Sequence, residues 1–90
     1  MIGRRWTGAI LWALGERPHY FAELSLVIPR LSDRLLSRRL RELEAEGLVE
    51  RSVHQGGPAR VSYSLTEKGR ALEPAIRELR MWAKRWNGTA

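Results

Sequence analysis

Arginine and serine side chains recur at helical spacing in the middle of the chain. Arg34, Arg38 and Arg41 are three or four residues apart, so in a helix they share one face. Ser37 lies on the same face. A guanidinium group can donate two parallel hydrogen bonds to a phosphate or to the edge of a guanine, and a serine hydroxyl can donate to phosphate. The spacing therefore predicts a helix face that binds double-stranded DNA.

The positive charge of the chain is concentrated in this segment. Residues 30–41 hold five Arg and one Asp, a net charge of +4, and the whole 90-residue chain carries +6. Arg34 and Arg38 repel each other at their four-residue spacing, which is tolerable if phosphates neutralise them. We expect Arg34 and Arg38 to reach base edges. The residues expected to fix the register through phosphates are Ser32, Ser37, Arg39 and Arg41.

A recognition helix over about residues 32–46 is predicted to carry this face. Ser32 is a suitable N-cap, Asp33 suits the positive end of the helix dipole, and Gly47 is a typical residue to end a helix. The opposite face is an apolar stripe formed by Leu36, Leu40 and Leu43.

A β-hairpin, or wing, is predicted over about residues 48–65. Two runs of alternating apolar and polar residues flank the sequence Gln55-Gly56-Gly57-Pro58, which favours an antiparallel pair with an exposed tip at residues 55–60. We expect Arg60 to contact the DNA backbone or the minor groove, with His54 as a second candidate.

Two shorter helices should precede the recognition helix. The first is predicted over Arg5–Leu14 and closed by Gly15, and the second over Tyr20–Val27, with a bend at residues 17–19 between them. Pro29 should force a turn before the recognition helix.

A long helix, Glu67 to about Trp86, is predicted at the C-terminal end, with Thr66 as its cap and a kink at Pro74. Its apolar residues recur in a heptad-like pattern, and large aromatic residues are common where subunits pack. We therefore expect a homodimer. The expected interface comprises Trp6, Leu72, Ile76, Leu79, Trp82 and Trp86.

The four tryptophans, Trp6, Trp12, Trp82 and Trp86, allow a second interpretation. Aromatic side chains also form pockets for planar or cationic small molecules. Packing in the core or at a dimer interface is the favoured interpretation, and a small-molecule effector stays open.

Several classes of function lack the residues they need. The chain has no cysteine, which excludes disulfides and thiol chemistry by this chain, and its two histidines do not suggest a metal site. No catalytic constellation or cofactor-binding loop is recognisable, so we expect no enzyme and no cofactor. No run is apolar enough to cross a membrane and no secretory cleavage site is visible, so a cytoplasmic location is expected.

Five parts of the sequence resemble the HxlR-type winged helix-turn-helix regulators, within the MarR-like winged-helix superfamily. They are RRWTGAILWAL, YFAEL, LSDRLLSRRLRELEAEGLVER, PARVSYSLTEKGRAL and the proline at Pro74. The resemblance extends over roughly Ile2–Trp82. It implies a small DNA-binding protein that acts as a homodimer on inverted repeats, with the dimer built from the N-terminal segment and the C-terminal helix.

The chain departs from that family in two respects. Many members carry a reactive cysteine before the first helix, and this chain has none. The chain also begins close to Trp6, which leads us to expect most of the dimer contact from the C-terminal helix.

The expected fold is mainly α-helical with a small antiparallel hairpin, a single winged helix-turn-helix domain over residues 1–90. The expected function is that of a transcriptional regulator bound to a pseudo-palindromic operator. The alternative is a winged-helix module for protein–protein interaction, in which the arginine face docks on an acidic partner.

Overall fold

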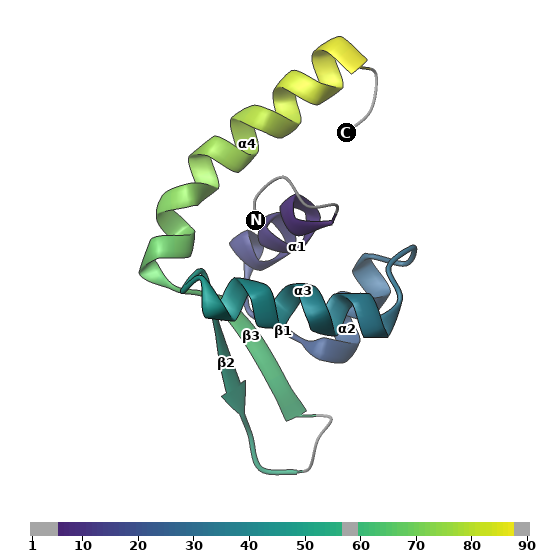
Figure 1. The fold of residues 1–90 in the computed structure, drawn as a ribbon, viewed down its shortest axis with the longest axis vertical. Coiled ribbons are helices and arrows are strands. Elements are labelled where there is room, and N and C mark those ends of the chain that lie inside the picture. Colours follow the sequence, from purple (N-terminus) through teal and green to yellow (C-terminus); the bar gives the residue numbers. More distant parts are fainter. Residues whose placement is uncertain (1–5, 57–59, 88–90) are drawn as a thin grey trace.

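The computed structural model describes residues 6–56 and 60–87. Its helices and strands follow in the order α1 Thr7–Glu16, β1 His19–Tyr20, α2 Phe21–Val27, α3 Asp33–Ala45, β2 Val49–Val53, β3 Val61–Leu65 and α4 Glu67–Asn87. Helices α1, α2 and α3 gather beside the β2–β3 hairpin, and α4 leads away from them past α1 (Figure 1). The architecture is the expected mainly helical one with a hairpin wing.

Helix α3 forms as its sequence predicts. The Ser32 hydroxyl oxygen accepts a hydrogen bond from the backbone N–H of Leu35 at 3.1 Å and so caps the first turn. After the last turn, Gly47 has a φ of 75°, a left-handed conformation that glycine adopts at little cost. The residues of the apolar stripe are fully buried, namely Leu36, Leu40 and Leu43.

The hairpin also forms, and the sheet has a third strand that the sequence did not reveal. Strands β2 and β3 pair antiparallel from Val49–Leu65 to Val53–Val61. Strand β1 joins the free edge of β3, giving the strand order β1-β3-β2. The prediction of a bend at residues 17–19 followed by a helix from Tyr20 was wrong at His19 and Tyr20, which form β1. A two-residue strand is too short to show an alternating pattern in the sequence.

Helix α1 does not end at Gly15. It continues to Glu16, and Arg17 then adopts an extended conformation. Gly15 matters for space instead, since a Cβ atom there would lie 2.6 Å from Oε2 of Glu73 on α4. A side chain at this position would displace the carboxylate of Glu73. The predicted start at Arg5 lies outside the described residues.

Helix α4 runs through Pro74 and changes direction between its first turns and its C-terminal half (Figure 1). The Thr66 hydroxyl accepts a hydrogen bond from the Gly69 N–H at 3.1 Å and donates one to the Gly47 carbonyl at 2.6 Å. These bonds confirm Thr66 as a cap and tie α4 to the end of α3. No helix in the described ranges is long and apolar enough to span a membrane.

Candidate nucleic-acid interface

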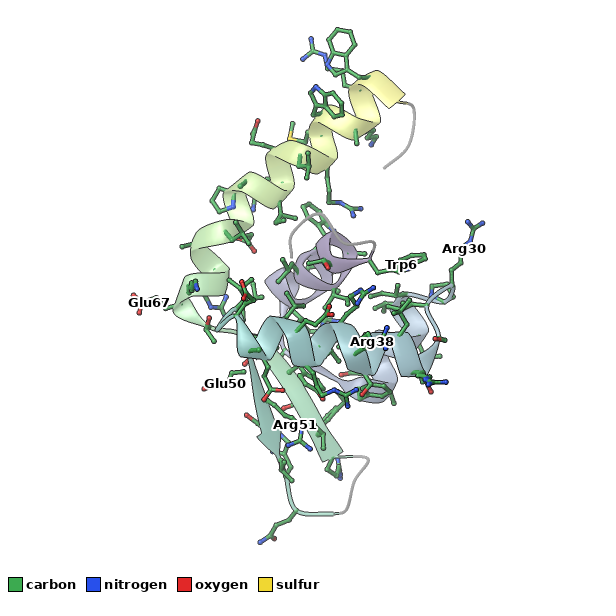
Figure 2. The ribbon with its side chains drawn as sticks, viewed as in Figure 1. Trp6, Arg30, Arg38, Glu50, Arg51 and Glu67 are labelled. Carbon is green, nitrogen blue, oxygen red and sulfur yellow. The ribbon has the colours of Figure 1, made fainter. Side chains whose placement is uncertain are left out.

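The exposed face of α3 brings the predicted DNA contacts together. Arg34, Arg38 and Arg41 are exposed and Ser37 is half-buried. A shallow depression of about 260 Å³ is lined by Ser32, Arg34, Leu35 and Arg38. Figure 2 shows Arg38 on α3 among the other side chains. The arrangement presents several donors to a polyanion at the N-terminal end of a helix, where the helix dipole also favours negative charge.

The three exposed arginines of this face have no acidic partner in the part of the chain that the structure describes. Among the described residues, no ion pair involves Arg34, Arg38 or Arg41. Their guanidinium groups are therefore free to bind phosphate or base edges without first breaking a contact within the chain.

The turn between α2 and α3 fixes the direction of the arginine face. The Ser25 hydroxyl donates a 2.6 Å hydrogen bond to Oδ1 of Asp33, which links the end of α2 to the first residue of α3. The backbone N–H of Leu31 also donates to the Ile28 carbonyl at 3.1 Å within the turn. Both bonds hold α3 at a set angle to α2, as a helix-turn-helix requires.

Arg39 lies apart from the other predicted contacts. Its side chain is only 10% exposed, and Nη1 of Arg39 pairs with Oε1 of Glu42 at 2.9 Å. A contact with phosphate would require this buried pair to open. The position of Arg39 on the flank of α3 gives it a structural role, and it is not retained among the proposed DNA contacts.

Arg60 lies next to the tip of the wing, just before β3, and is exposed. Gly56 has a φ of 114°, and a Cβ atom there would lie 3.1 Å from Cγ of Arg60. Only glycine combines this backbone conformation with room for the arginine. The predicted tip residues Gly57, Pro58 and Ala59 lie outside the described residues.

Tyr20 anchors the wing, a role that no sequence pattern suggested. The guanidinium carbon of Arg60 lies 5.9 Å from the centre of the Tyr20 ring, and the His54 ring meets the same ring edge-on at 5.8 Å. His54 also bonds through Nε2 to the Ser62 hydroxyl at 2.8 Å. The backbone N–H of His54 donates to the Arg60 carbonyl at 2.9 Å. Tyr20 thus joins β1 to both wing residues predicted to meet DNA.

Glu23 in turn holds Tyr20 in place. Oε1 of Glu23 accepts a 2.8 Å hydrogen bond from the backbone N–H of Tyr20, and Oε2 lies 3.2 Å from Nη2 of Arg17. These two contacts hold the pKa of the Glu23 carboxyl below its usual value of 4.5. The hydrogen bond from the Tyr20 backbone has the larger effect, and the hydrogen bond from Arg17 has the smaller one. The carboxylate therefore stays charged, and keeps this capping contact, to a lower pH than an ordinary glutamate would.

The predicted dimer residues fall into two groups. Ile76 is 4% exposed and belongs to the core of its own chain, while Leu72 and Trp6 are partly buried against that core. Three residues of the second half of α4 remain exposed, Leu79 at 56%, Trp82 at 54% and Trp86 at 68%. The heptad pattern therefore serves the core of the chain in its first half and leaves an exposed apolar face in its second half.

The described residues contain no group of three or more potential metal ligands from histidine, aspartate and glutamate. The polar side chains of the interface are suited to hydrogen bonding and charge neutralisation.

Comparison with known proteins places this geometry in a family. The profile of the HxlR-like helix-turn-helix family matches residues 1–90. The HTH-type transcriptional regulator YvaP of Bacillus subtilis is 43% identical over 86 residues, which cover 96% of this chain and 80% of YvaP.

Two solved structures are similar throughout. Quinone-bound YodB from B. subtilis is 40% identical with a TM-score of 0.80, and the match covers 94% of this chain and 89% of YodB. The redox regulator HypR in its reduced form is 38% identical with a TM-score of 0.87, over 93% of this chain and 83% of HypR. The chain, with its winged helix-turn-helix and its exposed arginine face, belongs to the HxlR-like helix-turn-helix family and is a DNA-binding transcriptional regulator.

Proposed function

We propose that the protein binds a pseudo-palindromic operator as a homodimer, with α3 in the major groove. The observation that carries this proposal is the exposed face of α3 formed by Arg34, Arg38 and Arg41, which make no ion pair with any other described residue. Arg34 and Arg38 would read base edges, while Arg41, Ser32 and Ser37 would contact phosphates. Arg60, held by Tyr20, would reach the neighbouring backbone or minor groove.

The dimer would form through the second half of α4. Leu79, Trp82 and Trp86 are large apolar residues left exposed on this helix, as is typical of a subunit interface. A two-fold axis would place the two α3 helices about one turn of duplex apart, roughly 34 Å. We also propose that the protein acts in the cytoplasm and without catalysis, as its family's role in transcription regulation favours. A small-molecule effector is also part of the proposal, supported by the quinone-bound state of the relative YodB.

Fluorescence anisotropy tests the proposal. The natural upstream duplex and a scrambled duplex of equal length should be titrated with protein at low and at physiological salt. We expect the natural duplex to bind about a thousandfold more tightly at physiological salt. Equal binding of both duplexes would contradict sequence-specific recognition. No binding to either would favour an acidic protein as the partner of the arginine face.

A further inference from the structure

The end of α3 and the start of α4 are linked by hydrogen bonds to three successive carbonyl groups. Nζ of Lys68 donates to the Glu46 carbonyl at 2.9 Å. The Thr66 hydroxyl donates to the Gly47 carbonyl at 2.6 Å, and the Thr66 backbone N–H donates to the Leu48 carbonyl at 3.1 Å. Carbonyl groups at a helix C-terminus have no partner within the helix, so these bonds satisfy groups that α3 leaves open. Residues 46–48 and 66–69 together form what we call the α3–α4 joint.

Gly69 lets the two segments of the joint approach closely. A Cβ atom there would overlap the carbonyl oxygen of Leu48 and would lie 3.3 Å from Cδ2 of Leu65. Gly69 is buried, and its own backbone N–H donates to the Thr66 hydroxyl at 3.1 Å. A larger residue at this position would have to push the first turn of α4 away from the end of α3.

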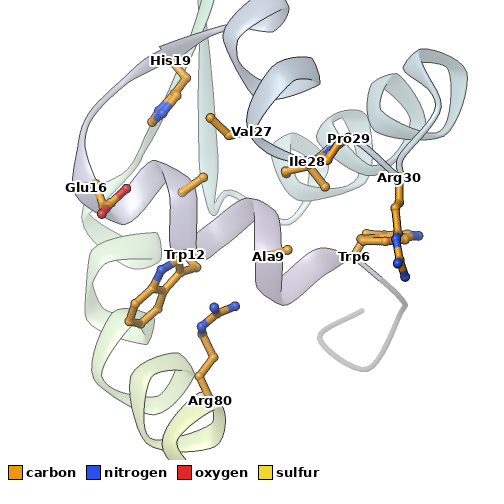
Figure 3. Close-up of a pocket in the computed structure, with 11 residues that line it drawn as sticks. Trp6, Ala9, Trp12, Glu16, His19, Val27, Ile28, Pro29, Arg30 and Arg80 are labelled. Carbon is orange, nitrogen blue, oxygen red and sulfur yellow. The ribbon is translucent and has the colours of Figure 1, made fainter. Parts of the chain in front are cut away.

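Beyond the joint, α4 packs mainly against α1 (Figure 1). Ile76 is buried in the core, and the guanidinium carbon of Arg80 lies 4.5 Å from the centre of the Trp12 ring on α1 (Figure 3). The joint and these contacts hold α4 in one direction relative to α3. The second half of α4 carries the exposed apolar residues of the proposed dimer interface, Leu79, Trp82 and Trp86.

The length of α4 makes the angle at the joint important for the distance between two subunits. Trp82 lies about 20 Å beyond Gly69 along a helix that rises about 1.5 Å per residue. A tilt of about 10° at the joint would therefore move Trp82 by about 3.5 Å relative to α3, close to the rise of one base pair, about 3.4 Å. In a two-fold symmetric dimer the same change occurs in both subunits.

We propose that Thr66, Lys68 and Gly69 are positioning residues that set which half-site spacing the dimer accepts. They act through the angle between α3 and α4, which fixes the distance and the rotation between the two recognition helices. The base contacts of α3 read the sequence of each half-site, whereas the joint determines the separation of the half-sites. The inference rests on the proposed homodimer and its pseudo-palindromic operator, and it assigns the specificity for spacing to residues of this chain.

The test measures binding to duplexes that differ only in the separation of the two half-sites. Fluorescence anisotropy compares the natural operator with duplexes that have one or two base pairs added or removed at its centre, and each base pair changes the separation by about 3.4 Å and the rotation by about 35°. The natural protein should bind the altered duplexes about tenfold or more weakly, since a dimer that fits one half-site alone loses an avidity of about 10²–10⁴. Thr66→Val/Lys68→Gln removes both side-chain links of the joint and should reduce this difference to about threefold or less, because a looser connection adapts to several spacings.

Two control variants and a shorter duplex separate spacing from general effects on folding and charge. Thr66→Ser keeps the hydroxyl and should retain the natural preference for one spacing. Arg70→Gln, at an exposed position of α4 outside the joint, should retain it as well. All of these proteins should bind a duplex with a single half-site equally, because the contacts of α3 are unchanged, and sedimentation velocity should show the same dimer mass for each.

The outcomes distinguish the role of the joint from the proposed function. An unchanged spacing preference in Thr66→Val/Lys68→Gln would overturn the inference. Weaker binding of that variant to the single half-site, with an equal loss at every spacing, would overturn it too, because the joint would then support α3 alone. A natural protein that binds all spacings equally would contradict the proposed pseudo-palindromic operator, and the inference with it.

Discussion

Arg38 and Arg39 are neighbours in the chain, yet their side chains lie in different environments. Arg38 is exposed beside Arg34, whereas Arg39 is 10% exposed and paired with Glu42. The 100° step between successive helical residues brings Arg39 to about 40° from Leu43, on the border of the buried stripe. The same residue type therefore has two roles on α3, and angular position decides between them.

Replacing Arg39 should affect stability and spare DNA binding. Arg39→Gln removes a mostly buried charge-assisted hydrogen bond, so we expect unfolding in urea to require about 1–3 kcal/mol less free energy. The salt dependence of DNA binding by the folded variant should equal that of the natural protein. Arg41→Gln, at an exposed position proposed to contact phosphate, is the matched control and should keep full stability while its DNA binding becomes less dependent on salt. An Arg39→Gln variant of full stability with a reduced salt dependence would show that Arg39 contacts phosphate.

Sequence reasoning was sufficient for residues whose role follows from helical periodicity or capping. Ser32, Gly47 and the leucine stripe of α3 behave as predicted because their roles depend only on near neighbours in the chain. The role of Tyr20 depends on His54 and Arg60, which lie 34 and 40 positions further along the chain, and no local pattern encodes such contacts. Helical periodicity did indicate that Arg39 would be mostly buried, since its position borders the buried face of α3.

At the scale of elements, long periodic segments were predictable and the shortest strand was not. Helix α3 and the β2–β3 pair repeat their patterns over 13 and five residues. Strand β1 has two residues and exists because β3 offers it a free edge. That third strand is what brings Tyr20 to the wing.

Removing the Tyr20 ring should loosen the wing. Tyr20→Ala removes the ring that packs against His54 and Arg60, so we expect a loss of about 0.5–1 kcal/mol in DNA-binding free energy, the typical size of an exposed cation–π contact. Tyr20→Phe keeps the ring and should bind like the natural protein. Both variants should be compared by anisotropy on the natural duplex.

A double-mutant cycle separates this role from a general effect on folding. In an Arg60→Ala background, Tyr20→Ala should cost measurably less affinity than it does alone, because the two residues act through one contact. Purely additive losses would show that Tyr20 does not act through Arg60.

At the scale of the whole molecule, the second half of α4 extends away from the core (Figure 1). Its apolar face has no partner within the described chain, while the first half of the same heptad pattern is used internally through Ile76. A heptad pattern cannot distinguish contacts within a chain from contacts between chains. The sequence therefore predicted the apolar face of α4. It could not show which residues of that face pack in the core of the chain and which remain exposed for a second subunit.

The double variant Trp82→Ala/Trp86→Ala should shift the protein from dimer to monomer. Both indoles are more than half exposed, so the substitution removes apolar surface from the proposed interface and little from the core. Sedimentation velocity at micromolar protein measures the change. Leu26→Ala is a suitable control, because this leucine is 80% exposed on α2, away from α4. An unchanged dimer mass in the tryptophan variant would place the interface elsewhere.

The most direct test of the central claim is operator binding, at several salt concentrations, by the triple variant Arg34→Gln/Arg38→Gln/Arg41→Gln. Each arginine that neutralises a phosphate contributes about one unit to the slope of log affinity against log salt, and a base contact adds about 1–3 kcal/mol of discrimination. We predict that the triple variant loses most of its preference for the natural duplex through Arg34 and Arg38 and has a shallower slope through Arg41, while Arg70→Gln matches the natural protein. An equal slope and an unchanged preference in the triple variant would show that the exposed face of α3 does not bind DNA.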